Sequence, residues 1–113
     1  MADFNQVFEE GRLTSDAQVD RLPNGTTVVQ FCIACNEDHR RTRDEWVKKC
    51  SFFKCYVYGG YAESLLPSLV KSTKVIISGK LEQQHWTTPD GEERAQVVII
   101  CGKVRVLGKE RAG

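Results

Sequence analysis

Three aromatic residues and one lysine occupy every second position of the stretch FFKCYVY, residues 52–58. If this stretch is a β-strand, its even-numbered residues share one face, because successive side chains point to opposite sides. That face carries Phe52, Lys54, Tyr56 and Tyr58. Aromatic rings stack on nucleobases and cations attract phosphates, so the pattern is typical of a surface that binds single-stranded nucleic acid.

Trp86 is a second candidate for base stacking. In KVIISGKLEQQHW, residues 74–86, apolar residues at alternate positions predict a strand with one face toward a core. Trp86 falls in register with Lys80, on the polar face. Two interpretations stay open: the ring stacks on a base, or a bulge at Gly79 turns it back into the core.

The segment from residue 37 to residue 49 is rich in charge, with five basic and four acidic side chains and hence a net charge of +1. In one interpretation its cations follow a nucleic-acid backbone. In the other it is a solvated hairpin with internal salt bridges. Trp46, in the same segment, either stacks on DNA or braces the hairpin. The basic residues are Arg40, Arg41, Arg43, Lys48 and Lys49.

Cysteine and histidine are also candidates for disulfides, metal binding and catalysis. The chain has five cysteines, an odd number, which favours free thiols over a disulfide framework. Cys32 and Cys35 have zinc-ligand spacing, but residues three apart on a strand point to opposite faces, so we expect apolar cysteines and no metal or other cofactor. A cysteine nucleophile with His39 or His85 as base would need a third orienting group, and nothing in the spacing suggests one. We predict no catalysis.

Length and composition set broad limits. The chain has 113 residues and a mass of 12.8 kDa, enough for one domain with one core, and 41% of its residues are apolar. The net charge is only +1, so a positive surface must come from local placement. The longest apolar run is residues 97–101, and the N-terminus does not look like a secretory signal. We expect a cytoplasmic protein with no membrane partner.

Turn residues divide the chain into short extended segments. We expect a polar loop at 14–25, a charged excursion at 36–49, and a helix at 62–71 that Pro67 shortens or kinks. Pro-Asp-Gly at 89–91 predicts a hairpin turn, and a change of apolar parity near Gly102 predicts a bulge. Strands are expected at 6–13, 26–35, 50–59, 74–86 and 95–107. Five strands with one helix between the third and fourth predict an all-β, five-stranded Greek-key OB-fold barrel.

Several short motifs follow one another in a specific order. They are Asn5 and Val7, GRLT at 11–14, Asp16, PNG at 23–25, VVQFCIACN at 28–36, Trp46-Val47, FFKCYVYG at 52–59, Ala62-Glu63, Leu69 and Lys71, VIISGKL at 75–81, Trp86, and Asp90-Gly91. In this order and spacing they resemble the bacterial single-stranded DNA-binding protein family, over residues 5–107.

The resemblance implies an OB-fold domain at residues 1–107 that binds single-stranded DNA without sequence preference, in replication, recombination and repair, close to the nucleoid. It implies stacking rings at Phe52, Tyr58 and Trp86, with Lys54 and Lys71 placed for phosphates. It also implies a homo-oligomer, a tetramer by resemblance with a dimer left open. With the basic segment included, the predicted DNA-binding residues are Trp86, Phe52, Tyr58, Lys54, Lys71, Trp46, His39, Arg40, Arg41, Arg43, Lys48, Lys49 and Lys80.

The chain also departs from the family. His39 stands where a stacking tryptophan is common, and the segment Glu82 to His85 replaces basic residues, which predicts weaker phosphate contact. Glu9-Glu10 in the first strand puts the usual subunit contact in question. Residues 108–113 read as a short remnant in place of the usual linker and acidic tail. The alternative is an OB-fold paralogue that acts mainly as a protein-interaction module in replication restart and binds DNA weakly. Preference between DNA and RNA stays open.

Overall fold

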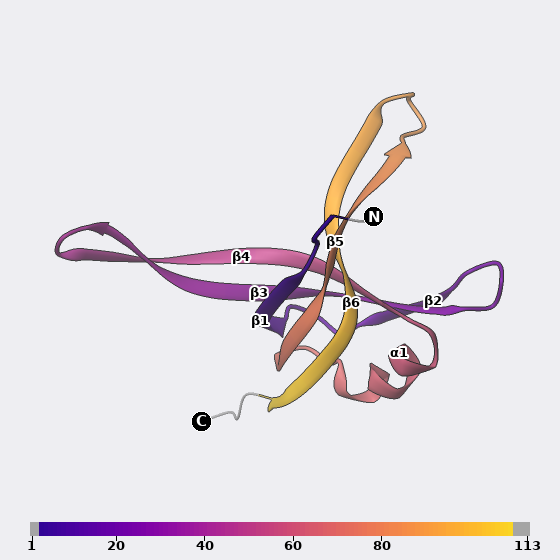
Figure 1. The fold of residues 1–113 in the computed structure, drawn as a ribbon, viewed down its shortest axis with the longest axis horizontal. Coiled ribbons are helices and arrows are strands. Elements are labelled where there is room, and N and C mark those ends of the chain that lie inside the picture. Colours follow the sequence, from indigo (N-terminus) through magenta and orange to yellow (C-terminus); the bar gives the residue numbers. More distant parts are fainter. Residues whose placement is uncertain (1–2, 110–113) are drawn as a thin grey trace.

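The computed structural model describes residues 3–109, except for the side chains of His39, Arg41 and Lys109. Within that range the chain is almost entirely β-structure with one short helix (Figure 1). The elements are β1 (Val7–Leu13), β2 (Gln18–Arg21), β3 (Thr27–Thr42), β4 (Glu45–Tyr58), α1 (Gly59–Leu65), a 3₁₀ turn (Leu66–Ser68), β5 (Thr73–Thr87) and β6 (Glu93–Lys109).

Five of these strands close into a barrel. They pair in the order β1-β5-β6-β4-β3, and β1 also pairs with β3 at Leu13 and Ile33, which closes the ring. The contact between β4 and β6 is parallel and short, with Cys55 opposite Ile99; the other pairings are antiparallel. This is the Greek-key OB-fold barrel that the sequence predicts. The short strand β2 is added at the edge of β3.

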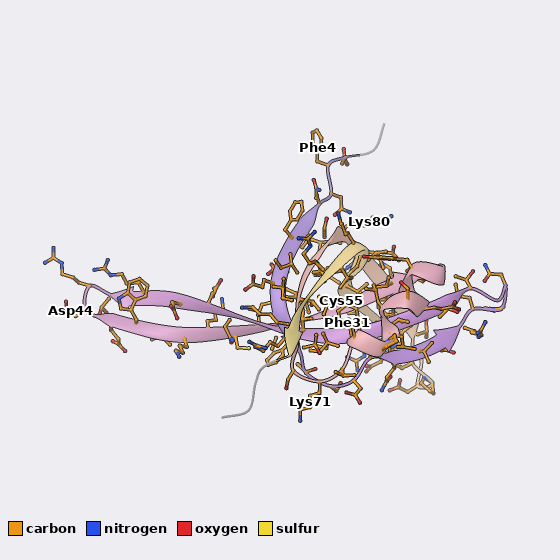
Figure 2. All side chains as sticks on the ribbon, turned by 90° about the horizontal axis from the view of Figure 1, so that it is seen from below. Phe4, Phe31, Asp44, Cys55, Lys71 and Lys80 are labelled. Atoms are coloured by element: carbon orange, nitrogen blue, oxygen red, sulfur yellow. The ribbon has the colours of Figure 1, made fainter. Side chains whose placement is uncertain are left out.

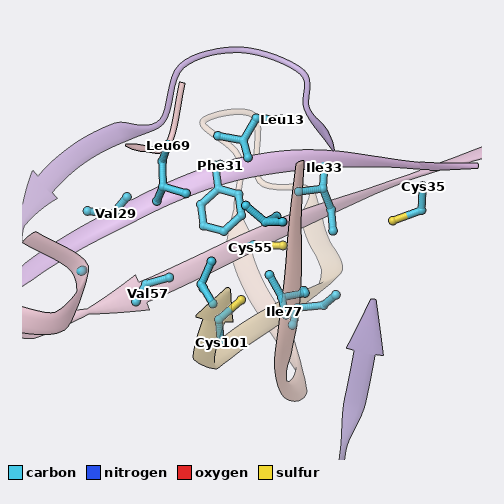
Figure 3. Packing of buried hydrophobic residues seen from close by; sticks show 14 residues of the cluster. Leu13, Val29, Phe31, Ile33, Cys35, Cys55, Val57, Leu69, Ile77 and Cys101 are labelled. Carbon is cyan, nitrogen blue, oxygen red and sulfur yellow. The ribbon is translucent and has the colours of Figure 1, made fainter. Parts of the chain in front are cut away.

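The barrel interior holds the alternating apolar residues of its strands (Figure 3). Val29, Phe31 and Ile33 occupy alternate positions of the strand expected at 26–35, and all three are buried in the core. Cys55 and Cys101 also lie inside, and a hydrogen bond between their thiols together with burial raises the pKa of Cys55 well above its ordinary value. These thiols therefore serve as small apolar core groups.

Two hairpins project beyond the barrel (Figure 1). The first extends β3 and β4 to a turn at residues 43–44, so the charged excursion expected at 36–49 is a hairpin of paired strands, as the second interpretation of this segment has it. Opposite charges face each other across this hairpin, with Glu37 opposite Lys49 and Asp38 opposite Lys48. Cross-strand pairs of this kind stabilise a sheet that has no apolar face. The loop expected at 14–25 is also interrupted, by β2.

The second hairpin joins β5 and β6 and begins at a bulge. Ser78 is paired with Lys103, but Gly79 is paired with Cys101, so Gly102 is the extra residue. A Cβ on Gly79 would lie 2.1 Å from the carbonyl oxygen of Ile100, a distance at which only glycine fits. The bulge expected near Gly102 is confirmed. At the far end, Gly91 has φ 89° in the predicted hairpin turn.

The helix lies earlier in the chain than expected. It spans Gly59–Leu65 rather than 62–71, and Pro67 lies in the 3₁₀ turn that follows, so the expected shortening by Pro67 is confirmed. The hydroxyl of Tyr61 accepts a hydrogen bond from the N–H of Val104 at 2.9 Å and donates one to its carbonyl oxygen at 3.1 Å. This contact fastens α1 to β6. Among the described residues, no helix is long and apolar enough to cross a membrane.

Candidate nucleic-acid interface

An open groove runs across the outer face of β2, β3 and β4 toward the hairpin of β5 and β6. It consists of three adjoining hollows that share Gln18, Gln30, Lys54 and Gln84 as lining residues. We call it the aromatic groove and define it by Gln18, Gln30, Lys54, Tyr56, Tyr58, Glu82, Gln84 and Trp86. These residues come from four strands, so the folded barrel is needed to assemble the groove.

The row of rings on β4 forms one wall. The ring centroids of Tyr56 and Tyr58 lie 6.5 Å apart with an angle of 17° between the planes. The Nζ of Lys54 lies 5.5 Å from the centroid of Tyr56, within reach of a cation–π interaction. Phe52 follows on the same face and is 64% exposed. The face of alternating rings and cation that the sequence predicts on this strand is therefore confirmed.

Trp86 stands on the opposite wall, on β5. It is 46% exposed and pairs across the hairpin with Arg94. The interpretation that a bulge at Gly79 returns this ring to the core is wrong, because the bulge lies where the hairpin leaves the barrel and the ring lies beyond it. Trp86 and Lys54 line the same hollow, which places a stacking surface and a cation together.

The electrostatics of the groove are mixed. Glu82 lines it beside Lys54, and Glu82 forms none of the salt bridges found among the described residues. Burial, followed by the charges of Glu82 and Tyr56, raises the pKa of Tyr58 above its ordinary value. The groove therefore offers rings and hydrogen-bonding groups more than a strong positive field, as the sequence predicts from Glu82 to His85.

The hairpin of β3 and β4 carries most of the predicted basic residues. Arg40 donates hydrogen bonds to the carbonyl oxygens of Thr42 at 3.2 Å and Arg43 at 2.6 Å, and its guanidinium lies 5.8 Å from the ring centroid of Trp46. Of the two interpretations of Trp46, these contacts favour the brace, although the ring stays 64% exposed and open to further stacking. Arg40 is committed to the turn.

The remaining predicted cations are spread over several surfaces. Lys48 shares the face of Trp46 on β4, whereas Lys49 is on the other face, 4.0 Å from Glu37. Arg43 is exposed at the turn. Internal salt bridges, the second interpretation of this segment, therefore account for Lys49. The side chains of two other predicted residues, His39 and Arg41, lie outside the described part of the structure.

Lys71 and Lys80 lie apart from each other (Figure 2). The backbone N–H of Lys71 donates to Asp16 at 2.8 Å, which places this residue beside the end of the groove that Asp16 lines. Lys80 lines a separate hollow with Phe4 and Lys103. The structure thus brings Lys54, Tyr58 and Trp86 together, with Phe52 and Lys71 at the margins, and leaves Lys80 outside.

Four kinds of groove residue are absent from the predicted set, the first being Glu82, which the sequence marks only as replacing a basic residue. Tyr56 could have been found from the same alternation that singled out its neighbours. Gln18 and the rest of β2 gave no signal, because this short strand is exposed along its whole length and carries no apolar alternation. The amides of Gln30 and Gln84 were missed because glutamine on a strand is ordinarily a solvated residue. Gln30 donates to Gln18 at 3.0 Å.

The two glutamates of β1 are separated by the pleat. Glu10 points outward and forms a salt bridge with Lys74 at 3.1 Å. Glu9 is half-buried on the inward side of the strand. Burial, and next the charge of Glu9 and its hydrogen bond, raise the pKa of the Cys35 thiol to about 12. Glu9 is thus the inward glutamate of the pair, and the Cys35 thiol is its neighbour.

The chain resembles known proteins in sequence. Residues 4–107 match the single-strand binding protein family. The chain is 34% identical over 113 residues to a single-stranded DNA-binding protein of Treponema pallidum, covering 100% of this chain and 63% of that relative. It is 34% identical over 108 residues to one of Aquifex aeolicus, covering 96% of this chain and 73% of that relative.

Two solved structures share the fold. A Plasmodium falciparum SSB in complex with ssDNA has a TM-score of 0.84 at 23% identity, covering 97% of this chain and 98% of that one. A deletion mutant of the single-stranded DNA binding protein from Thermus aquaticus has a TM-score of 0.82 at 20% identity, covering 92% of this chain and 50% of that one. At these identities the structures support the barrel architecture alone.

Proposed function

The chain belongs to the single-strand binding protein family, and from that premise we propose that its aromatic groove binds and protects single-stranded DNA without requiring a particular sequence. The family is one of binding proteins, so the proposal contains no catalytic step. In the cell this activity would serve replication, recombination and repair.

One observation carries the proposal: the rings of Tyr58 and Trp86 and the cation of Lys54 line one continuous groove from two different strands. A single strand laid in the groove can place its bases against the rings, where stacking contributes about 1–3 kcal/mol per base. Its phosphates can lie near Lys54. Because every base has a flat face, this arrangement accepts any sequence.

Substitution of single rings tests the proposal. Trp86→Ala and Phe52→Ala should each weaken binding of single-stranded oligonucleotides of all compositions, by about fivefold or more if one stacked base is lost. Phe4→Ala is the matched control, because Phe4 is a fully exposed ring outside the groove. Unchanged affinity in both Trp86→Ala and Phe52→Ala would refute the proposed track and favour the alternative, a protein-interaction module.

We extend the proposal to a homo-oligomer. The outer face of β1 and β5 exposes Phe8, at 65%, next to Ile76, and the salt bridge between Glu10 and Lys74 neutralises the charge there. An apolar patch of this kind is suited to a second copy of the chain. Sedimentation equilibrium tests this; a monomer at micromolar concentration would contradict it, and the mass distinguishes dimer from tetramer.

A further inference from the structure

We infer that Glu82 biases the aromatic groove toward bases that carry an amino group, so that cytosine binds more tightly than thymine. The inference rests on the proposed function. It refines sequence independence into a preference for base type, set by one carboxylate beside the rings.

The two walls of the groove face each other residue by residue. Tyr56 on β4 contacts Gln84 on β5, with its hydroxyl 3.5 Å from Oε1. Lys54, Glu82, Gln84 and Trp86 line one hollow beside this contact. Glu82, two residues before Gln84, shares the face of Gln84 because side chains alternate along a strand.

Because β6 is parallel to β4 and antiparallel to β5, β4 and β5 run in opposite directions. With Tyr56 in contact with Gln84, Glu82 therefore lies on the side of Tyr58. In agreement, its charge is the second cause, after burial, of the raised pKa of the Tyr58 hydroxyl. A base stacked on the ring of Tyr58 would therefore have an edge near the carboxylate of Glu82.

The chemistry of that edge decides which bases fit. An ionised carboxylate accepts hydrogen bonds and donates none. Cytosine presents the N4 amino group, which glutamate and aspartate recognise in other complexes, whereas thymine presents the O4 acceptor at the same place. Two acceptors facing each other repel and leave both unsatisfied. Adenine, with its N6 amino group, belongs with cytosine.

Glu82 is available to accept a hydrogen bond from a base. It forms none of the salt bridges within the described residues, although Lys54 lines the same hollow. A carboxylate in a groove that receives a polyanion weakens binding unless it faces bases rather than phosphates. Glu82 lies beside the ring of Tyr58. A base stacked on that ring brings its edge, and not a phosphate of the strand, next to the carboxylate.

The test compares oligo-dC and oligo-dT of equal length in competition against one labelled oligonucleotide, at fixed salt and neutral pH. The wild-type chain should bind oligo-dC at least about fivefold more tightly, the lower end for a good base contact. In Glu82→Gln the ratio should fall to within about twofold, since an amide both donates and accepts. Glu45→Gln, which removes the same charge at the turn of the β3–β4 hairpin, should keep the wild-type ratio.

Three other outcomes count against the inference. If Glu82→Gln strengthens binding of both oligonucleotides alike, Glu82 only repels phosphates; the inference fails and the proposed function stands. If the wild-type chain binds oligo-dC and oligo-dT with nearly equal affinity, the inference also fails and the proposed function stands. If the wild-type chain binds neither oligonucleotide at low salt, the proposed function fails and the inference fails with it.

Discussion

The hydroxyl of Tyr56 lies 3.5 Å from Oε1 of Gln84, and this contact joins β4 to β5 across the aromatic groove. The two residues are 28 positions apart in the chain. Beside this contact, Lys54, Glu82 and Trp86 line one hollow, and the charge of Glu82 also acts on Tyr58.

Gly79→Ala should destabilise the fold strongly. A Cβ at this position would lie 2.1 Å from the carbonyl oxygen of Ile100, so β5 and β6 would have to separate at the bulge. We expect a loss of at least about 2 kcal/mol in the free energy of unfolding, measured by urea denaturation. The control is Gly60→Ala, where a Cβ meets nothing within 4 Å and α1 should be unchanged or slightly more stable. Equal stabilities in the two variants would contradict this account of the bulge.

Lys54→Gln should reduce the salt dependence of DNA binding. Loss of one phosphate contact lowers the slope of log affinity against log salt by about 0.7 for a single strand. Lys49→Gln is the control, since Lys49 is on the other face and is paired with Glu37 at 4.0 Å. The wild-type slope should also be smaller than that of a family member with basic residues before the tryptophan. A steeper slope would show that other cations replace them.

The stability of the fold should fall as pH rises above about 9. The pKa of Cys35 is raised from 9.0 to about 12 in the folded protein, mainly by burial. Between these values the folded state holds a proton that the unfolded state has released, so the stabilisation is complete below pH 9 and is lost as pH rises toward 12.

Cys35→Ala checks this assignment. Removing the thiol should flatten the fall in unfolding free energy by up to about 1 kcal/mol per pH unit, read from urea denaturation at several alkaline pH values. Cys50→Ala is the control, because Cys50 is exposed. Identical pH profiles for wild type and Cys35→Ala would show that Cys35 does not titrate in this window.

Arg40→Ala should loosen the turn of the β3–β4 hairpin. The guanidinium holds the carbonyl oxygens of Thr42 and Arg43 and covers Trp46, so its loss removes two hydrogen bonds and a cation–π contact. We expect faster amide hydrogen exchange at residues 42–46, with the barrel unaffected. Arg43→Ala keeps the carbonyl that Arg40 contacts and should exchange as the wild type does. Unchanged amide exchange in Arg40→Ala would show that Arg40 does not brace the turn and Trp46.

The barrel could be predicted from the sequence because apolar alternation within short segments marks its strands. Alternation in residues 26–35 placed Val29, Phe31 and Ile33 in the core, and the parity change near Gly102 located the bulge. The β3–β4 hairpin was predicted only as one of two interpretations, because its charged residues carry no apolar alternation. Its strands are held by pairing in register, as between Asp38 and Lys48, which no single segment reveals.

The site was predictable in part for the same reason. Phe52, Lys54 and Tyr58 follow one another on one strand, so their common face could be read from spacing. The position of Glu82 toward Tyr58 could not, because it depends on how β5 leaves the barrel at Gly79 and runs alongside β4. Lys80 was misleading in the opposite way: it shares the parity of Trp86 but lies directly after the bulge at Gly79, in another hollow.

Titration with oligo-dT of increasing length, at two salt concentrations, tests the central claim most directly. The signal is the fluorescence of Trp46 and Trp86, of which Trp86 stands in the groove. We predict stoichiometric quenching at low salt that weakens at high salt, with most of it lost in Trp86→Phe. Saturation length then reports how many subunits share a strand. Absence of quenching and of any retained oligonucleotide at low salt would contradict the assignment of the groove as a single-stranded DNA track.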